Sequence, residues 1–113
     1  MYYNKFQDIE LSALGLGCMR LPVINGEESN PDPKATEEMI DYAMAHGVNY
    51  YDTAWGYHYG KSETIVGDAL SKYDHKDFYI ATKFPGYDLG NFGKHEEIFE
   101  EQLRKCKVDY FDF

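Results

Sequence analysis

Three side chains in this sequence could act together in acid–base chemistry. Asp52 ends the apolar run that starts at residue 48, and Lys83 ends a second run that starts at residue 78. Tyr57 follows Asp52 in a glycine-containing segment. The carboxyl ends of parallel strands meet at one face, where barrel enzymes place their catalytic groups. We therefore expect a carboxylate, an ammonium group and a phenol to lie together.

The pairing of Asp52 with Lys83 has a physical reason. A charge at the end of a buried strand needs a partner, and neighbouring strands are about 5 Å apart. The same pair could be purely structural. Tyr57 favours a catalytic role, because a phenol is a poor acid at neutral pH unless a cation lies beside it. With Lys83 as that cation, Tyr57 could protonate a carbonyl oxygen while a hydride reaches the carbonyl carbon.

The elements that must position these residues recur at intervals of about thirty residues, the length of a βαβ unit. Strand-like runs begin near Leu14, Val48, Phe78 and Tyr110. Helical patterns lie between them, over residues 32–47, 62–70 and 94–105. This order predicts an α/β fold with about four parallel strands and three crossover helices.

Local signals mark the helix ends and the remaining segments. Asp32 is expected to cap the first helix, with Pro33 at its first position and Gly47 at its end. Ser62 is the expected cap of the second helix, and Gly67 is expected to allow close packing. Two further strands, at residues 3–6 and 9–12, are expected to form a hairpin that closes the bottom of a barrel.

Composition excludes several classes of partner. The net charge of −9 and scattered Lys and Arg argue against nucleic acid or an anionic membrane. No apolar run approaches the roughly 20 residues that span a bilayer, and the amino terminus lacks an apolar signal core, so we expect a cytoplasmic protein. Neither the two cysteines nor the four histidines have ligand spacing, so no disulfide or metal site is expected.

Separated motifs in this chain resemble the aldo-keto reductases. They are Asp-Thr-Ala-Trp-Gly-Tyr at residues 52–57, Gly-Lys-Ser-Glu at 60–63, Ala-Thr-Lys at 81–83 and Leu-Gly-Leu-Gly-Cys-Met-Arg-Leu-Pro at 14–22. Their order and spacing make the resemblance specific, and it covers nearly the whole chain, whereas Gly15-x-Gly17 alone would be a weak signal.

The resemblance implies that residues 1–113 form one incomplete domain, the N-terminal half of a TIM-type (β/α)₈ barrel. The full-length parent would reduce aldehydes and ketones with NADPH. Within the family's Asp, Tyr, Lys and His set, Tyr57 would donate the proton, Lys83 would assist it, and Asp52 would orient Lys83. The family's histidine ends the fourth strand, which only begins at Tyr110 here.

The resemblance also implies a cofactor loop, in which Gly17, Cys18, Met19 and Arg20 lie against the nicotinamide half of NADPH and Asp52 lies near its ribose. This Gly-Cys-Met-Arg loop is most similar to a bacterial and archaeal subgroup whose longer members carry a C-terminal iron–sulfur domain. Cys18 itself is expected to be a small packing residue, since no histidine lies nearby in sequence to activate it.

Three residues around Tyr57 leave alternatives open. Trp55 could form an apolar wall for a small carbonyl substrate, or it could simply pack. His58 could line the same pocket, although a solvated loop histidine is the simpler expectation. His58 and Tyr59 interrupt the family's Tyr-Gly-x-Ser-Glu run, so Tyr59 is a second candidate for the phenol. The spacing from Asp52 favours Tyr57.

A complete barrel needs about 250 residues, so half of the ring would be missing from this chain. We expect it to bind NADPH poorly, to be inactive alone and to self-associate through open strand edges. The alternative is a non-catalytic half-barrel module that assembles with itself or with a partner. A lyase that uses Lys83 as a Schiff base is a third hypothesis, disfavoured because Asp52 should keep Lys83 charged.

Overall fold

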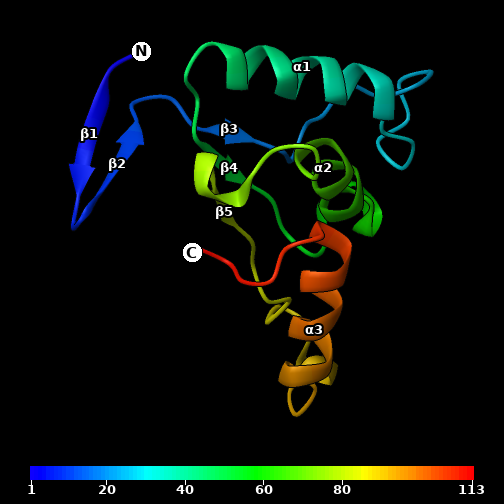
Figure 1. Cartoon of the computed structure of the whole chain (residues 1–113). Coiled ribbons are helices and arrows are strands. Elements are labelled where there is room, and N and C mark those ends of the chain that lie inside the picture. The colour runs from blue at the N-terminus through cyan, green and yellow to red at the C-terminus, as the bar shows by residue number, and fades with distance from the viewer.

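The computed structural model describes residues 1–113 and contains two small sheets and three α-helices (Figure 1). The strands are β1 (Tyr3–Phe6), β2 (Ile9–Ser12), β3 (Leu16–Gly17), β4 (Tyr50–Asp52) and β5 (Tyr79–Ala81). The helices are α1 (Pro33–Ala45), α2 (Ser62–Leu70) and α3 (His95–Cys106). Short 3₁₀ turns are η1 (Tyr57–Gly60), η2 (His75–Asp77) and η3 (Leu89–Asn91).

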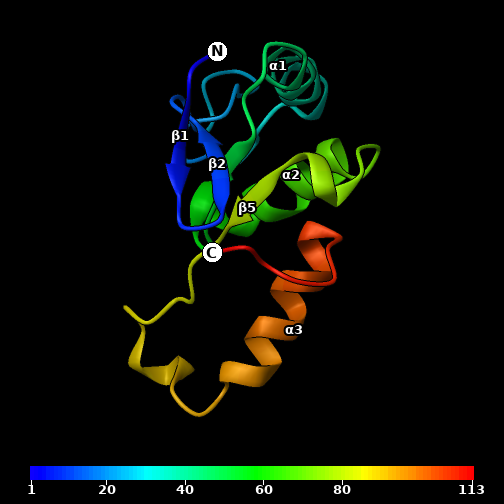
Figure 2. The same ribbon diagram turned by 60° about the vertical axis from the view of Figure 1, so that its left-hand side comes forward.

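The main sheet is parallel, with strand order β3-β4-β5. Gly17 is in register with Asp52, and Asp52 is in register with Ala81, so the carboxyl ends of the strands meet at one edge. In Figure 2 the helices lie on one side of the strands and the hairpin on the other, while the carboxyl terminus lies at the end of β5. The predicted α/β order of parallel strands and crossover helices is therefore confirmed for three strands.

The fourth strand, expected from Tyr110, is not formed. Residues 107–113 have no regular structure, and the N–H groups of Asp112 and Phe113 both donate to Ile80 O, at 3.1 and 3.3 Å. A ladder needs successive bonds along both chains, whereas here two donors share one acceptor. The Asp112 carboxylate also accepts bonds from Ile80 N at 2.9 Å and His75 Nε2 at 2.8 Å, so these bonds join the segment to β5 at the single residue Ile80.

The hairpin of β1 and β2 forms as predicted and lies at the amino ends of the parallel strands. Tyr3 Oη donates to Gly47 O at 2.9 Å. Ser12 N donates to Asn49 Oδ1 at 2.8 Å, and Asn49 Nδ2 donates to Glu10 O at 3.0 Å. These contacts precede β4 directly, so the hairpin closes the end opposite to the one that carries Asp52.

The helix ends follow local chemistry in α1 but not in α2. Asp32 caps α1 by accepting from Ala35 N at 3.1 Å, and Pro33 is the first helical residue, as predicted. The expected capping role of Ser62 is wrong. The residue before α2 is Lys61, which makes no side-chain cap, while Ser62 is fully buried and turns its hydroxyl toward the main sheet.

The core lies between the sheet and the helices. Its largest buried side chains include Ile40 of α1, Leu70 of α2 and Tyr51 and Ile80 of the sheet. Gly67 allows the close packing that the sequence suggests, because a Cβ there would lie 2.5 Å from the Lys105 carbonyl of α3. None of the helices combines the length and the apolar character that crossing a membrane requires.

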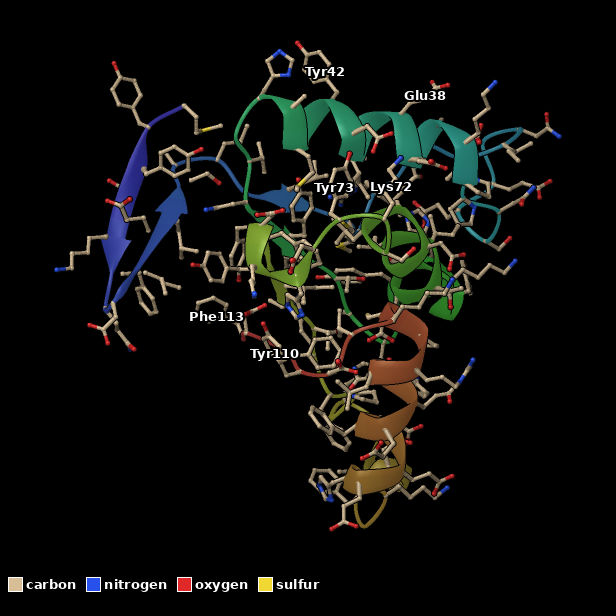
Figure 3. All side chains as sticks on the ribbon, viewed as in Figure 1. Glu38, Tyr42, Lys72, Tyr73, Tyr110 and Phe113 are labelled. Atoms are coloured by element: carbon tan, nitrogen blue, oxygen red, sulfur yellow. The ribbon has the colours of Figure 1, made fainter.

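A surface ion-pair cluster ties the segment after α2 to α1. Lys72 Nζ lies 2.8 Å from Glu37 Oε1 and 2.6 Å from Asp41 Oδ2. Figure 3 shows Lys72 and Tyr73 below α1, and Tyr110 and Phe113 further down, near the carboxyl terminus. The Phe113 ring packs against Phe6 of the hairpin, with ring centres 5.7 Å apart.

Candidate active site

The predicted ion pair is present at the carboxyl edge of the sheet. Asp52 is the last residue of β4, and Lys83 follows β5 by two positions. Lys83 Nζ lies 2.9 Å from both carboxylate oxygens of Asp52 and 3.0 Å from Thr53 O. The side chains are 50% and 33% exposed for Lys83 and Asp52, so the pair can be reached from solvent.

Tyr57 completes the group. It begins the turn η1, and Lys83 Nζ lies 4.8 Å from the centre of its ring. Partial burial lowers the pKa of Lys83, but the hydrogen bonds to the Asp52 carboxylate and the interaction with the nearby Tyr57 phenol outweigh it and raise the pKa overall. Lys83 therefore stays an ammonium group at neutral pH.

Tyr59, the rival phenol, is 77% exposed and does not line the pocket that contains Lys83. Its backbone has a φ of 55°, as His58 before it has a φ of 52°. Two successive left-handed residues send the chain sharply outward between Tyr57 and α2. The structure thus brings Tyr57, and not Tyr59, to the lysine.

Tyr57 and Lys83 border a cavity of about 540 Å³, and half of the residues that line it are aromatic. Its lining consists of Ala54, Trp55, Gly56, Tyr57, Lys83, Phe84, Gly86 and Tyr87. A Cβ on Gly56 would lie 2.7 Å from Tyr87 Oη, so the loop after β5 packs directly on the loop after β4. None of the four histidines lines this cavity.

The segment after β3 is fastened beside the ion pair through Cys18. Cys18 N donates to Asp52 O at 2.8 Å, and Ser62 Oγ donates to Cys18 O at 2.9 Å. The thiol is fully buried, and burial, with a smaller effect from Asp52, raises its pKa to about 12. The side chain and the backbone of Cys18 are thus engaged within the protein, and an unreactive packing role is its best description.

The neighbours of Cys18 are free to meet a bound molecule. Gly17, Met19 and Arg20 are exposed, and a Cβ on Gly17 would have nothing within 4 Å. An open backbone, an apolar side chain and an exposed guanidinium group, on a segment that is hydrogen-bonded to Asp52 O, suit the nicotinamide and ribose half of a dinucleotide. The residues present therefore fit the cofactor that the sequence motifs imply.

His58 is neither solvated nor part of the cavity that contains Lys83. It is 6% exposed, its Nε2 accepts from Leu21 N at 2.9 Å, and its Nδ1 donates to Glu28 O at 2.7 Å. It therefore fastens residues 21–28 to η1. A partner 37 positions away leaves no local signal, so sequence reasoning missed this role.

A buried polar network supports the site and was also missed. Glu63 Oε1 lies 2.9 Å from Lys105 Nζ, and Glu63 Oε2 accepts from Thr82 Oγ1 at 2.7 Å and from Gln102 Nε2 at 3.1 Å. Gln102 Nε2 also donates to Lys83 O at 2.9 Å. The network connects α2, β5 and α3 directly behind Lys83.

Comparison with known proteins identifies the class. The Aldo/keto reductase family model matches residues 13–113, which is most of the chain and includes every residue of the site. The chain belongs to the aldo/keto reductase family.

Curated relatives agree with this assignment. An uncharacterized oxidoreductase, YqkF of Bacillus subtilis, is 38% identical over 93% of this chain and 34% of its own length. The aldo-keto reductase YhdN of the same bacterium is 33% identical over 99% of this chain and 36% of its own length. The chain therefore spans about a third of the length of these relatives.

Solved structures show the same correspondence. The holo form of aldo-keto reductase AKR11C1 from Bacillus halodurans superimposes with a TM-score of 0.71 at 30% identity, over 93% of this chain and 35% of that protein. A thermostable aldo-keto reductase, Tm1743, gives 0.78 at 26% identity over 99% and 41%. The present fold aligns with the N-terminal part of aldo-keto reductase barrels.

Proposed function

We propose that this chain is the N-terminal part of an NADPH-dependent reductase of aldehydes or ketones, with Tyr57 as the proton donor. The observation that carries the proposal is the position of Lys83 Nζ, which lies 2.9 Å from both Asp52 oxygens and 4.8 Å from the Tyr57 ring centre. A phenol with a fixed ammonium group beside it, at the edge of an aromatic cavity, is suited to protonating a carbonyl oxygen.

Each residue has a distinct task in this mechanism. Bound NADPH would supply the hydride to the carbonyl carbon. Tyr57 gives its proton to the carbonyl oxygen, a step worth about a hundred- to ten-thousand-fold in rate. Lys83 stabilises the phenolate that remains, and Asp52 holds Lys83 in place against rotation of its long side chain.

The cofactor would lie along the segment after β3. Gly17, Met19 and Arg20 would border its nicotinamide half, with Asp52 near the ribose. Cys18 holds this segment in place through its backbone hydrogen bonds to Asp52 and Ser62. A Klebsiella pneumoniae aldo-keto reductase of the same fold was solved with NADPH, and a 39% identical Escherichia coli relative is named an NADH-specific methylglyoxal reductase. The preference for NADPH over NADH is thus itself part of the proposal.

The substrate would enter the aromatic cavity. Trp55 and Tyr87 would flank a small carbonyl compound, which would point its oxygen at Tyr57. We further propose that the three parallel strands are part of an eight-stranded ring, whose other units supply the family's histidine and the rest of the cofactor site. The isolated chain is therefore expected to be inactive.

A chimeric barrel tests the proposal. In the chimera, residues 1–113 replace the matching third of YhdN, and NADPH oxidation is followed with an aromatic aldehyde. Tyr57→Phe and Lys83→Met should each lower kcat at least a hundredfold, because they remove the acid or its cation. Tyr59→Phe is the matched control and should leave kcat within about twofold. Full activity of Tyr57→Phe would refute the assignment, and loss of activity only in Tyr59→Phe would transfer the role to that phenol.

A further inference from the structure

Trp55 is the only tryptophan of the chain and forms a wall of the aromatic cavity beside Tyr57. Lys105, near the end of α3, places its Nζ 4.2 Å from the centre of the Trp55 ring system. A cation over an indole face is held by the quadrupole of the ring, and the attraction strengthens when water is excluded. Two elements that are distant in sequence thus meet behind the cavity.

The position of Lys105 is itself tightly fixed. Its Nζ lies 2.9 Å from Glu63 Oε1 and 3.3 Å from Gly60 O, so a carboxylate and a backbone carbonyl confine the ammonium group from two sides. The side chains are 11% and 0% exposed for Lys105 and Glu63. A buried pair tolerates little displacement, because either charge alone would lose its compensation for lost hydration.

Glu63 is in turn hydrogen-bonded to the segment after β5, which contains Lys83. Thr82 donates to Glu63 Oε2, and Gln102 donates to both Glu63 Oε2 and Lys83 O. The wall of the cavity and the backbone of the reactive lysine therefore share one buried carboxylate as their support. A change in the Glu63–Lys105 pair would alter where the indole stands relative to Tyr57.

We propose that Lys105 is a positioning residue that fixes the Trp55 indole as a wall of the substrate cavity, with Glu63 as its anchor. The substrate part of this inference rests on the proposed reductase function. The structural part does not, because it concerns the orientation of one side chain in the chain as it stands. Lys105 does not line the cavity and acts only through Trp55.

The fluorescence of the single tryptophan reports directly on this contact. The test variants are Lys105→Met and the double variant Glu63→Gln/Lys105→Met, which removes both charges and leaves no buried carboxylate unpaired. Lys105→Arg keeps a cation. Lys107→Met is the matched control, since Lys107 pairs with Asp68 on the surface at the same end of α3. Emission maximum, anisotropy and acrylamide quenching are measured on folded 113-residue chains, with circular dichroism as the check of folding.

In both Lys105→Met variants we expect lower anisotropy and quenching by acrylamide that rises about twofold or more, because the indole loses its cation and moves more freely. Lys105→Arg should restore most of the wild-type signal, and Lys107→Met should match wild type. A folded double variant with unchanged emission, anisotropy and quenching would overturn the proposal. Unfolding of the double variant would also count against it, since the pair would then serve the fold as a whole.

The link to substrate is tested in the chimeric reductase. The double variant should raise KM for an aromatic aldehyde roughly tenfold and leave KM for NADPH unchanged, as expected when only the substrate wall moves. A changed Trp55 signal with unchanged KM would refute the substrate role alone. If the wild-type chimera lacks turnover while Trp55 still responds to the Lys105 variants, the reductase function fails and the positioning role stands.

Discussion

Two lysines near the cavity pair with carboxylates but differ in exposure. The Lys83 side chain is half exposed. The Lys105 side chain is almost completely buried, in contact with Glu63, Gly60 and Trp55. An exposed ammonium group can respond to a charge that develops on a neighbouring phenol. A buried one is confined to a single geometry. This difference in exposure supports the roles proposed here, a catalytic one for Lys83 and a positioning one for Lys105.

The two cysteines make the stability sensitive to alkaline pH. Burial, aided by the carboxylates of Asp52 and Glu63, raises the pKa of Cys18 and Cys106 from 9.0 to about 12. Between these values the unfolded chain releases thiol protons that the folded chain retains. The free energy of unfolding should therefore fall as pH rises from 9 toward 12, by up to about 1.4 kcal/mol per pH unit and thiol.

Urea unfolding at a series of alkaline pH values checks this expectation. The double variant Cys18→Ala/Cys106→Ala should lose less stability over the same pH interval than wild type, since tyrosines and lysines titrate equally in both proteins. An identical slope for the two proteins would contradict the assigned thiol pKa values.

Among the elements, the contact of α2 with α3 is the most constrained. A Cβ on Gly67 would approach the backbone of Lys105 and Cys106 at 2.5 and 2.6 Å, and backbone atoms cannot move aside as a flexible side chain can. Gly67→Ala should therefore lower the free energy of unfolding by about 1–3 kcal/mol. Gly17→Ala is a control with open space, and its effect should stay within about 0.5 kcal/mol. If urea unfolding gave the same loss of stability for Gly67→Ala and Gly17→Ala, α2 and α3 would have to move apart at little cost in free energy.

The contact between α2 and α3 also links the core to the candidate active site. Lys105 and Gln102 belong to α3, and both reach the Glu63 carboxylate of α2. A displaced α3 should also shift Trp55 and the backbone at Lys83. Gly67→Ala is thus expected to change the Trp55 emission, which Gly17→Ala should leave as it is.

The whole molecule exposes much apolar surface. The side chains of Tyr2, Tyr87 and Leu89 are almost fully exposed, and β3 has no strand on its outer side. Unpaired edges and apolar patches favour association, while the net charge of −9 opposes it. Raising the salt concentration screens that repulsion, so the apparent mass should increase with salt and protein concentration.

Gel filtration with light scattering measures this association. We expect broad, concentration-dependent species, as an open part of a barrel should give. A discrete dimer, stable on dilution, would favour the alternative that the chain is a self-assembling, non-catalytic module.

The sequence alone determined the order of the βα units, the Asp32 cap and the meeting of Asp52 with Lys83, because strand periodicity, capping and strand polarity are local or follow from topology. Only the tertiary structure decided the burial of His58, the buried position and hydrogen bond of Ser62, the Glu63–Lys105 pair and the absence of a strand at residues 110–113. These depend on partners that lie many positions away, such as the 44 positions between Ser62 and Cys18. Tertiary packing determines such contacts, and no periodic pattern of residues in the sequence predicts them.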